Sequence, residues 1–127
     1  MAREILDELV ATPKAPARAR ELVRGLPVAE ATRRNVELIV SELVTNSVIH
    51  TGATSRDRLS LRLRCEPSGV SGEVCDPGEG FNWVSDEPDL SEPGGLGLMV
   101  VDQLAASWGV RRDGKTCVWF ECVDSGA

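Results

Sequence analysis

The segment from Ala29 to His50 constrains the fold of this chain more than any other. Its apolar residues recur with the spacing of an amphipathic helix and form a broad stripe along one side. Gly52 lies just beyond the segment, and glycine commonly ends helices. The sequence therefore predicts one long helix with its apolar side on a core. The residues of the stripe are Val36, Leu38, Ile39, Val40, Leu43, Val44, Val48 and Ile49.

The segments around this helix predict two shorter helices. Residues 15–24 consist of helix formers, with Pro16 in the first turn and Gly25 where the helix would end. Residues 98–105 resume a helical pattern. Residues 3–10 fit a strand and a short helical turn equally well, so both alternatives stay open for this segment.

Alternation of apolar and polar residues predicts the strands. Residues 58–65 alternate in this way, and the turn at Pro67-Ser68-Gly69 leads into a second strand at 70–75. Such a short connection joins antiparallel strands. Two further strands are predicted on either side of a tight turn at Asp113-Gly114, at residues 108–112 and 116–123.

Together these elements predict an α+β fold, a two-layer sandwich in which helices cover one face of a mixed, mostly antiparallel sheet. The length of 127 residues and the 42% apolar content fit one domain over residues 1–127. The element order is not that of a doubly wound sheet, and no Walker-type G-x-x-x-x-G-K-[ST] segment occurs. Residues 77–95 predict a long loop, which in a small domain is usually functional.

Charge and hydropathy exclude several classes of partner. The formal net charge of −6 repels a nucleic-acid duplex and an anionic membrane. No apolar run approaches the roughly 20 residues that span a bilayer, and the N-terminus lacks a signal peptide's apolar core, so we expect a cytoplasmic protein. Several arginines crowd the first third, and a solvated helix face explains them better than a docking patch for a protein partner. They are Arg18, Arg20, Arg24, Arg33 and Arg34.

The four cysteines lack the paired short spacing of a zinc site or a redox dithiol. All of them fall in predicted strands, where cysteine behaves as a small buried hydrophobe. We expect free thiols, because disulfides are rare in a reducing compartment. The residues are Cys65, Cys75, Cys117 and Cys122.

Polar residues interrupt the apolar side of the long helix. Glu42, Asn46 and His50 are spaced four apart and therefore share one side over two turns. A buried polar group without a partner costs about 1–3 kcal/mol, so a ligand is expected to meet them. Asn46 can supply an oxygen to Mg²⁺, and Glu42 can accept a proton from an attacking hydroxyl or water. His50 fits a capping or structural role at least as well as a catalytic one.

Two glycine clusters follow in the order that a nucleotide site needs. Asp76 ends a strand, where its carboxylate can accept a hydrogen bond from an exocyclic amine such as that of adenine. Gly78 and Gly80 let the backbone lie close to a flat base. Gly95 and Gly97 open a helix whose N-terminus presents free amides to phosphates. Each motif alone is weak, but together with the polar side of the long helix they predict an ATP site.

The polar residues of the long helix and the two glycine clusters, in this order, resemble the motifs of the Bergerat-fold (GHKL) ATPases. This group includes sensor histidine kinases, gyrase, mismatch-repair ATPases and a heat-shock chaperone. Residues 42–50, 94–98 and 114–121 resemble, within that group, the bacterial anti-sigma-factor serine/threonine kinases. The resemblance implies that Glu42 is the general base and Asn46 the Mg²⁺ ligand. It implies an ATP pocket formed by Asn46, Asp76 with Thr116 at the adenine amine, Gly78, Gly80, Gly95, Gly97 and Leu98.

The resemblance also implies partners. Such ATPase domains bind a sigma factor and phosphorylate a serine or threonine of a small STAS-domain anti-anti-sigma antagonist, and homodimers are common among them, so we expect a homodimer here. One departure concerns residues 81–98, which contain no lysine or arginine, whereas many relatives place a cation there against the γ-phosphate. A non-catalytic, ATP-responsive module that binds and regulates a partner is therefore an open alternative.

Overall fold

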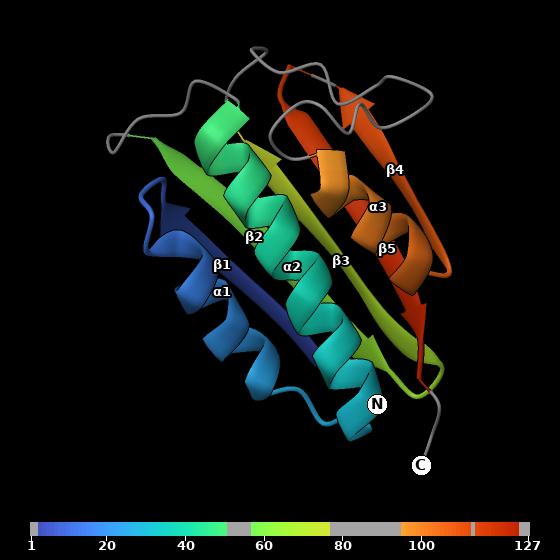
Figure 1. The fold of residues 1–127 in the computed structure, drawn as a ribbon. Helices are drawn as coiled ribbons and strands as arrows, with labels where there is room; N and C mark the ends of the chain where they lie inside the picture. Colours follow the sequence, from blue (N-terminus) through green and yellow to red (C-terminus); the bar gives the residue numbers. More distant parts are fainter. Residues whose placement is uncertain (1–2, 51–56, 77–94, 113, 125–127) are drawn as a thin grey trace.

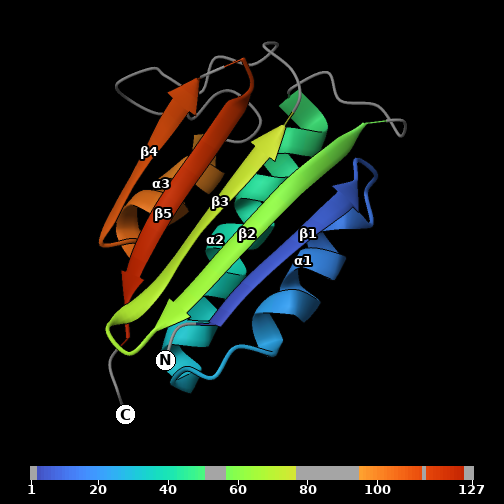
Figure 2. The ribbon, with the colours of Figure 1, turned by 180° about the vertical axis from the view of Figure 1, so that it is seen from behind.

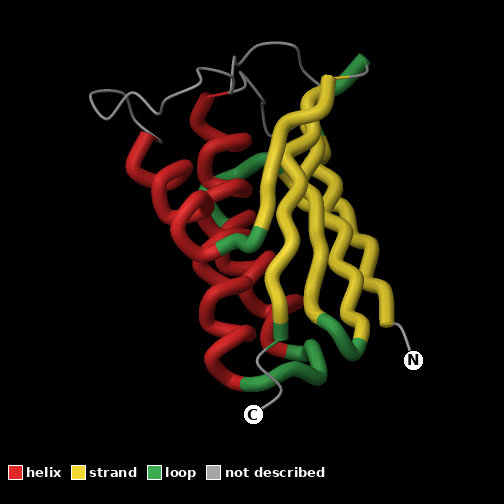
Figure 3. Tube along the Cα trace, turned by 90° about the vertical axis from the view of Figure 1, so that its right-hand side faces the viewer, coloured by secondary structure: helices red, strands yellow, loops and turns green. Residues whose placement is uncertain are grey.

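The computed structural model describes residues 3–50, 57–76, 95–112 and 114–124. In these residues, three helices lie on one face of a five-stranded sheet (Figures 1 and 3). The predicted α+β sandwich is therefore confirmed. The elements follow in the order β1 (Arg3–Val10), α1 (Ala15–Arg24), α2 (Glu30–His50), β2 (Arg58–Glu66), β3 (Gly69–Asp76), α3 (Gly95–Leu104), β4 (Ser107–Arg112) and β5 (Thr116–Val123).

The strands lie in the order β1-β2-β3-β5-β4, and each neighbouring pair is antiparallel. The N-terminal segment, for which a strand and a helical turn both fitted, is the edge strand β1. Between β1 and β2 the chain passes along the sheet twice, first as α1 and then as α2 (Figure 1). Because the two passes run in opposite directions, β2 returns antiparallel to β1. A mixed, mostly antiparallel sheet was predicted. The described strands contain only antiparallel pairs, so no parallel pair of a mixed sheet occurs among them.

The core lies between the sheet and α2, which crosses the middle of the helix layer (Figure 1). The inward residues of β2 are fully buried, as their alternation predicted. The stripe on α2 is narrower than predicted, because Leu38 and Ile49 are 51% and 59% exposed. A helix on one face of a sheet buries only the part of its surface that points at the strands and the neighbouring helices. The buried members of the stripe include Val36, Ile39, Val40, Leu43 and Val44.

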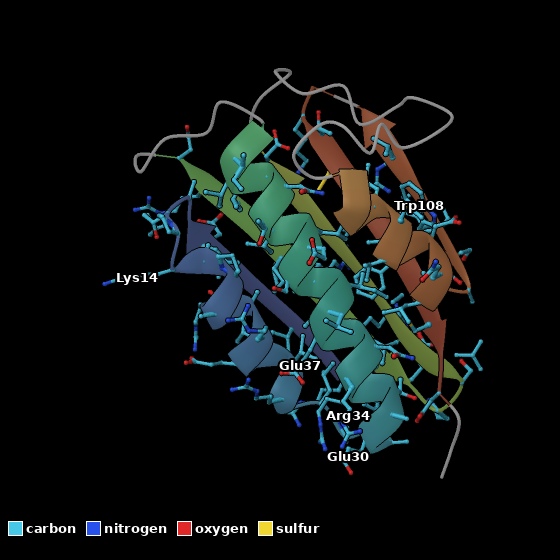
Figure 4. All side chains as sticks on the ribbon, in the orientation of Figure 1. Lys14, Glu30, Arg34, Glu37 and Trp108 are labelled. Atoms are coloured by element: carbon cyan, nitrogen blue, oxygen red, sulfur yellow. A yellow bond between two sulfur atoms is a disulfide. The ribbon has the colours of Figure 1, made fainter. Side chains whose placement is uncertain are left out.

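Four of the five arginines of α1 and α2 interact with acidic and hydroxyl side chains of the same helix layer and of β1. Arg24 pairs with Glu37 across the two helices at 2.8 Å, and Figure 4 shows Glu37 beside α1. Such exposed pairs contribute little to stability. The preference for a solvated helix face over a docking patch stays a prediction. The other contacts are Arg18 with Asp7 and Glu21, Arg20 with Ser41, and Arg34 with Glu30.

The face of the sheet opposite the helices is covered by none of the described helices (Figure 2). Charged residues alternate along its strands and pair across them, for example Arg62 with Glu4 at 3.1 Å and Arg111 with Glu73 at 2.6 Å. Such a polar face is the expected outer side of a two-layer fold. Among the helices built from described residues, none is long and apolar enough to cross a membrane.

Gly72 allows β3 and β5 to approach over the core. It lies opposite Phe120, which is fully buried. A Cβ atom added at Gly72 would lie 2.6 Å from Cζ of Phe120 and 3.0 Å from the carbonyl oxygen of Arg62. The ring and the neighbouring strand leave no room for a methyl group at this position.

Gly72→Ala is therefore expected to lower the free energy of unfolding by about 1–3 kcal/mol, because overpacking forces the ring or the strand to move. Urea denaturation measures this change. Gly25→Ala is the matched control, because its added Cβ would meet only the carbonyl oxygen of Leu22, at the ordinary distance of 3.6 Å. Equal stability of the two variants would contradict the close approach.

Candidate functional site

The predicted site residues lie on element ends that meet at one end of the molecule. Asn46 lies near the C-terminal end of α2, and Asp76 is the last residue of β3. Gly95 begins α3, and Thr116 begins β5. Figures 1 and 2 show these four ends at the same edge of the two layers. The chain therefore brings together three motifs that are far apart in the sequence.

Asn46 is the most informative side chain at this edge, because it is only 2% exposed. Within the described part of the chain, its amide nitrogen Nδ2 is the one buried side-chain nitrogen or oxygen atom that lacks a hydrogen-bond partner. A carboxamide can turn about its terminal bond and exchange its oxygen and nitrogen, so the open position can equally present a metal ligand. Leaving such a group unsatisfied is costly, which is the expected signature of a residue kept for a ligand.

Glu42 lies one turn before Asn46 on α2 and is half-buried. The spacing of four residues places both on the same side of the helix, as predicted. A carboxylate in this position keeps contact with water and stands close to whatever the buried amide binds. His50 is the last residue of α2.

Asp76 and Thr116 face each other as a cross-strand pair at the end of the β3–β5 ladder. Each is only 2% exposed, and each takes part in polar interactions. Opposed residues of an antiparallel ladder lie within reach of one small ligand group. The prediction that both residues serve the same part of a ligand thus concerns two residues that are neighbours in the sheet.

The helix α3 begins at Gly95, with Gly97 in its first turn and no acidic residue there. The first amides of a helix have no partner within it, and the positive end of the helix dipole lies beside them. An anion can therefore bind at this end. Leu98, also predicted as a pocket residue, is 7% exposed and belongs to the core cluster. The predicted residues Gly78 and Gly80 lie outside the described residues.

The expectation of four free thiols is wrong for one pair. Cys75 and Cys117 form a disulfide between β3 and β5. The bond links residues separated by 42 positions, which become neighbours only because the two strands pair in this register. The sequence positions of the cysteines contained a signal for this bond. Cys75 precedes Asp76 and Cys117 follows Thr116, so a pairing of Asp76 with Thr116 also brings the two cysteines together.

The expectation is confirmed for Cys65 and Cys122, which are buried free thiols. Burial raises the pKa of Cys122 to about 11. Burial, reinforced by Asp124, also raises the pKa of Cys65. Both groups are therefore neutral and inert near pH 7, as small core hydrophobes should be.

Comparison with a family model extends these observations. The model of the histidine kinase-like ATPase domain matches residues 6–122, which is most of the chain. No match was found among curated proteins. The matched range includes α2, β3, α3 and all but the last residue of β5, the elements whose ends meet at the site.

Solved structures with the same fold include the RsbU and RsbW domains of a Mycobacterium tuberculosis protein, with a TM-score of 0.72 and 16% identity over 98% of this chain and 33% of that chain. The blue-light activated histidine kinase of Erythrobacter litoralis has a TM-score of 0.62 and 23% identity over 86% of this chain and 40% of that chain. A structure of the histidine kinase domain of the same protein has a TM-score of 0.60 and 21% identity, over 91% of this chain and 64% of that chain. This chain thus spans less than two thirds of each. At these identities the similarity is one of fold.

Proposed function

The chain belongs to the family of histidine kinase-like ATPase domains, and we propose that it binds Mg-ATP at the edge where α2, β3, α3 and β5 meet. The observation that carries the proposal is Asn46, whose buried amide has an open hydrogen-bonding position at this edge. A buried amide of this kind suits Mg²⁺, which prefers oxygen ligands and completes its shell with phosphates and waters.

The proposal gives each side chain one task. Asp76, with Thr116 opposite, accepts a hydrogen bond from the adenine amine. The glycine-led N-terminus of α3 receives phosphate oxygens at its free amides. Asn46 holds Mg²⁺, which when bound would neutralise phosphate charge. Glu42, one turn away on α2, accepts the proton of the attacking hydroxyl.

We further propose that the domain acts as an anti-sigma-factor regulator in the cytoplasm. In this function it sequesters a sigma factor and transfers the γ-phosphoryl group to a serine or threonine of a STAS-domain antagonist, and it acts as a homodimer. The resemblance of residues 42–50, 94–98 and 114–121 to anti-sigma-factor kinases supports these partners. The family match supports the kinase-type ATPase chemistry.

A second candidate is a non-catalytic module that binds ATP and regulates a partner through it. The observation in its favour is the absence of lysine and arginine from residues 81–98. Phosphoryl transfer depends on neutralising the charge that develops on the transferred group. Without a cation in this segment, ATP would act as a ligand that changes partner affinity, and Glu42 would have no chemical task.

Glu42→Gln separates the two functions. If Glu42 is the general base, the variant is expected to transfer phosphate to a STAS-domain protein of the host about 10²–10⁴-fold more slowly, with a little-changed Kd for Mg-ATP. Labelled-phosphate transfer and calorimetry measure the two quantities. If wild-type protein binds Mg-ATP but labels none of the host's STAS-domain proteins, and Glu42→Gln still regulates its partner, the second candidate replaces the first.

A further inference from the structure

The disulfide joins the cross-strand pair directly beside Asp76 and Thr116. Cys75 precedes Asp76 in β3, and Cys117 follows Thr116 in β5. One peptide unit on each strand therefore separates the covalent link from the two residues that we assign to the base. Because a trans peptide unit is planar and stiff, a change of strand spacing at the cysteines is transmitted to this pair.

The link lies on the face of the sheet opposite to the proposed pocket. Val74 and Val118, the preceding pair toward the middle of the ladder, belong to the core under the helices. Side chains alternate between faces along a strand, so Cys75 and Cys117 point to the helix-free face, whereas Asp76 and Thr116 point to the helix side. The disulfide therefore does not compete with a nucleotide for space and acts only through the backbone.

The disulfide holds the two strands close together. The Cα atoms of Cys75 and Cys117 are 4.0 Å apart. Unlinked antiparallel pairs have Cα distances of about 4.5 or 5.5 Å, depending on their place in the ladder. Reduction leaves two thiols that need van der Waals separation, so the strands are expected to move apart at this pair and at the next.

We propose that Cys75 and Cys117 form a reversible thiol–disulfide site whose reduction raises the affinity of the adjacent pocket for Mg-ATP. Widening the end of the β3–β5 ladder makes room for the edge of the base between Asp76 and Thr116. The choice of Mg-ATP as the ligand rests on the proposed function. The thiol chemistry and the widening of the β3–β5 ladder do not depend on it.

The oxidation is a pair of thiol–disulfide exchanges with a low-molecular-weight disulfide. The thiolate of Cys117 attacks one sulfur of that disulfide, forms a mixed disulfide and releases one small thiolate. The thiolate of Cys75 then attacks the sulfur of Cys117 and expels the second. Two protein thiols are oxidised, the small disulfide is reduced to two thiols, and the two protons pass to them.

The surroundings of the pair set the rate of exchange. Arg111 lies opposite Cys117 in the β4–β5 ladder, and its guanidinium binds Glu73 at 2.6 Å. The carboxylate of Glu73 lies within 4.8 Å of both sulfurs, so the pair faces a joined cation and anion rather than an uncompensated cation. Cys75 and Cys117 are also only 3% and 2% exposed. Exchange therefore requires local opening, and the incubations should extend over hours, the slow end of the range for disulfide exchange.

The test compares two forms of the full chain, one incubated with dithiothreitol and one with oxidised glutathione. EDTA is present during these incubations, because Glu73 and the two sulfurs lie within 4.8 Å of one another and could hold a metal ion. Alkylation after denaturation, read by mass spectrometry, is expected to label Cys65 and Cys122 in the oxidised form and all four cysteines in the reduced form. Calorimetry with Mg-ATP, after removal of EDTA, is expected to give at least about fivefold tighter binding by the reduced form.

A readout without nucleotide separates this proposal from the proposed function. Amide hydrogen exchange in the β3–β5 ladder at Asp76 and Thr116 should be faster in the reduced form. If neither form binds Mg-ATP, the proposed function fails. Amide hydrogen exchange then still tests whether the disulfide changes the β3–β5 ladder. The claim about Mg-ATP affinity fails in that case.

Two double variants complete the design. Cys65→Ala with Cys122→Ala keeps the disulfide and should keep the redox response. Cys75→Ala with Cys117→Ala should bind Mg-ATP equally under both treatments. The proposal would be overturned if all four cysteines were labelled after oxidation. It would also be overturned if the two forms of the wild type had equal affinity for Mg-ATP and equal rates of amide hydrogen exchange.

Discussion

Asn46→Leu is expected to abolish Mg-ATP binding without reducing the stability of the fold. The loss should be about 100-fold or more in affinity, because even outer-shell partners of a metal commonly contribute 10–100-fold and Asn46 is assigned as a direct ligand. Isothermal titration calorimetry with Mg-ATP measures the change. Circular dichroism confirms that the variant is folded.

The expectation that stability is unchanged follows from the Nδ2 atom of Asn46, which is buried without a hydrogen-bond partner. An unsatisfied buried polar group costs about 1–3 kcal/mol, and leucine has a similar size with no polar atom. The free energy of unfolding of Asn46→Leu should therefore equal that of the wild type or exceed it by about 1 kcal/mol. A residue kept only for structure would show the opposite behaviour.

Ser47→Ala is the matched control. Ser47 is the next residue on α2, is 1% exposed and takes part in a polar interaction. Its removal should lower stability by about 1 kcal/mol and leave Mg-ATP binding intact. If Asn46→Leu binds Mg-ATP like the wild type, or loses as much stability as Ser47→Ala, the assignment of Asn46 to the metal fails.

Removal of the disulfide is expected to produce the largest loss of stability. The bond closes a loop between residues separated by 42 positions. Chain-entropy arguments give about 4 kcal/mol for a loop of this length, and measured values for disulfides are typically 2–4 kcal/mol. The double variant Cys75→Ala with Cys117→Ala should therefore unfold at a clearly lower guanidinium concentration than the oxidised wild type.

Reduction of the wild type provides the second arm of this measurement. Dithiothreitol should lower its unfolding midpoint toward that of the double variant and should not change the midpoint of the variant itself. Cys65→Ser is the control for a buried thiol that forms no disulfide. Its midpoint should respond to dithiothreitol as strongly as that of the wild type. Equal midpoints of oxidised and reduced wild type would show that the link is not formed in solution.

The sequence predicted the elements well because their signals are local. The alternation in residues 58–65 and the helical stripe of α2 reflect which side of each element meets the core. Turn residues such as Gly114, with its φ of 75°, mark the connections. The segment 3–10 stayed ambiguous because it is an edge strand, where only one neighbouring strand shapes the pattern.

The residues of the candidate site were also proposed from the sequence, because the proposed site is built from motifs at element ends. Asn46 and Asp76 stand out as polar residues at the ends of apolar segments, whereas Thr116 was implied by the family resemblance. Their burial at one edge of the fold depends on the order of strands and on the position of α2 over the sheet. That arrangement belongs to the packing of the whole chain, so no local pattern could supply it.

Local patterns in the sequence were enough to predict most elements and their α+β layering, because hydrophobic periodicity and turn chemistry act over a few neighbouring residues. The polar residues of the candidate site stay a prediction from those patterns and from the family resemblance. Only the tertiary structure decided that Cys75 lies opposite Cys117, that Gly72 lies against Phe120 and that one end of the Asn46 amide stays open. Each of these depends on the register between segments far apart in the chain, and register is set by the packing of the complete core.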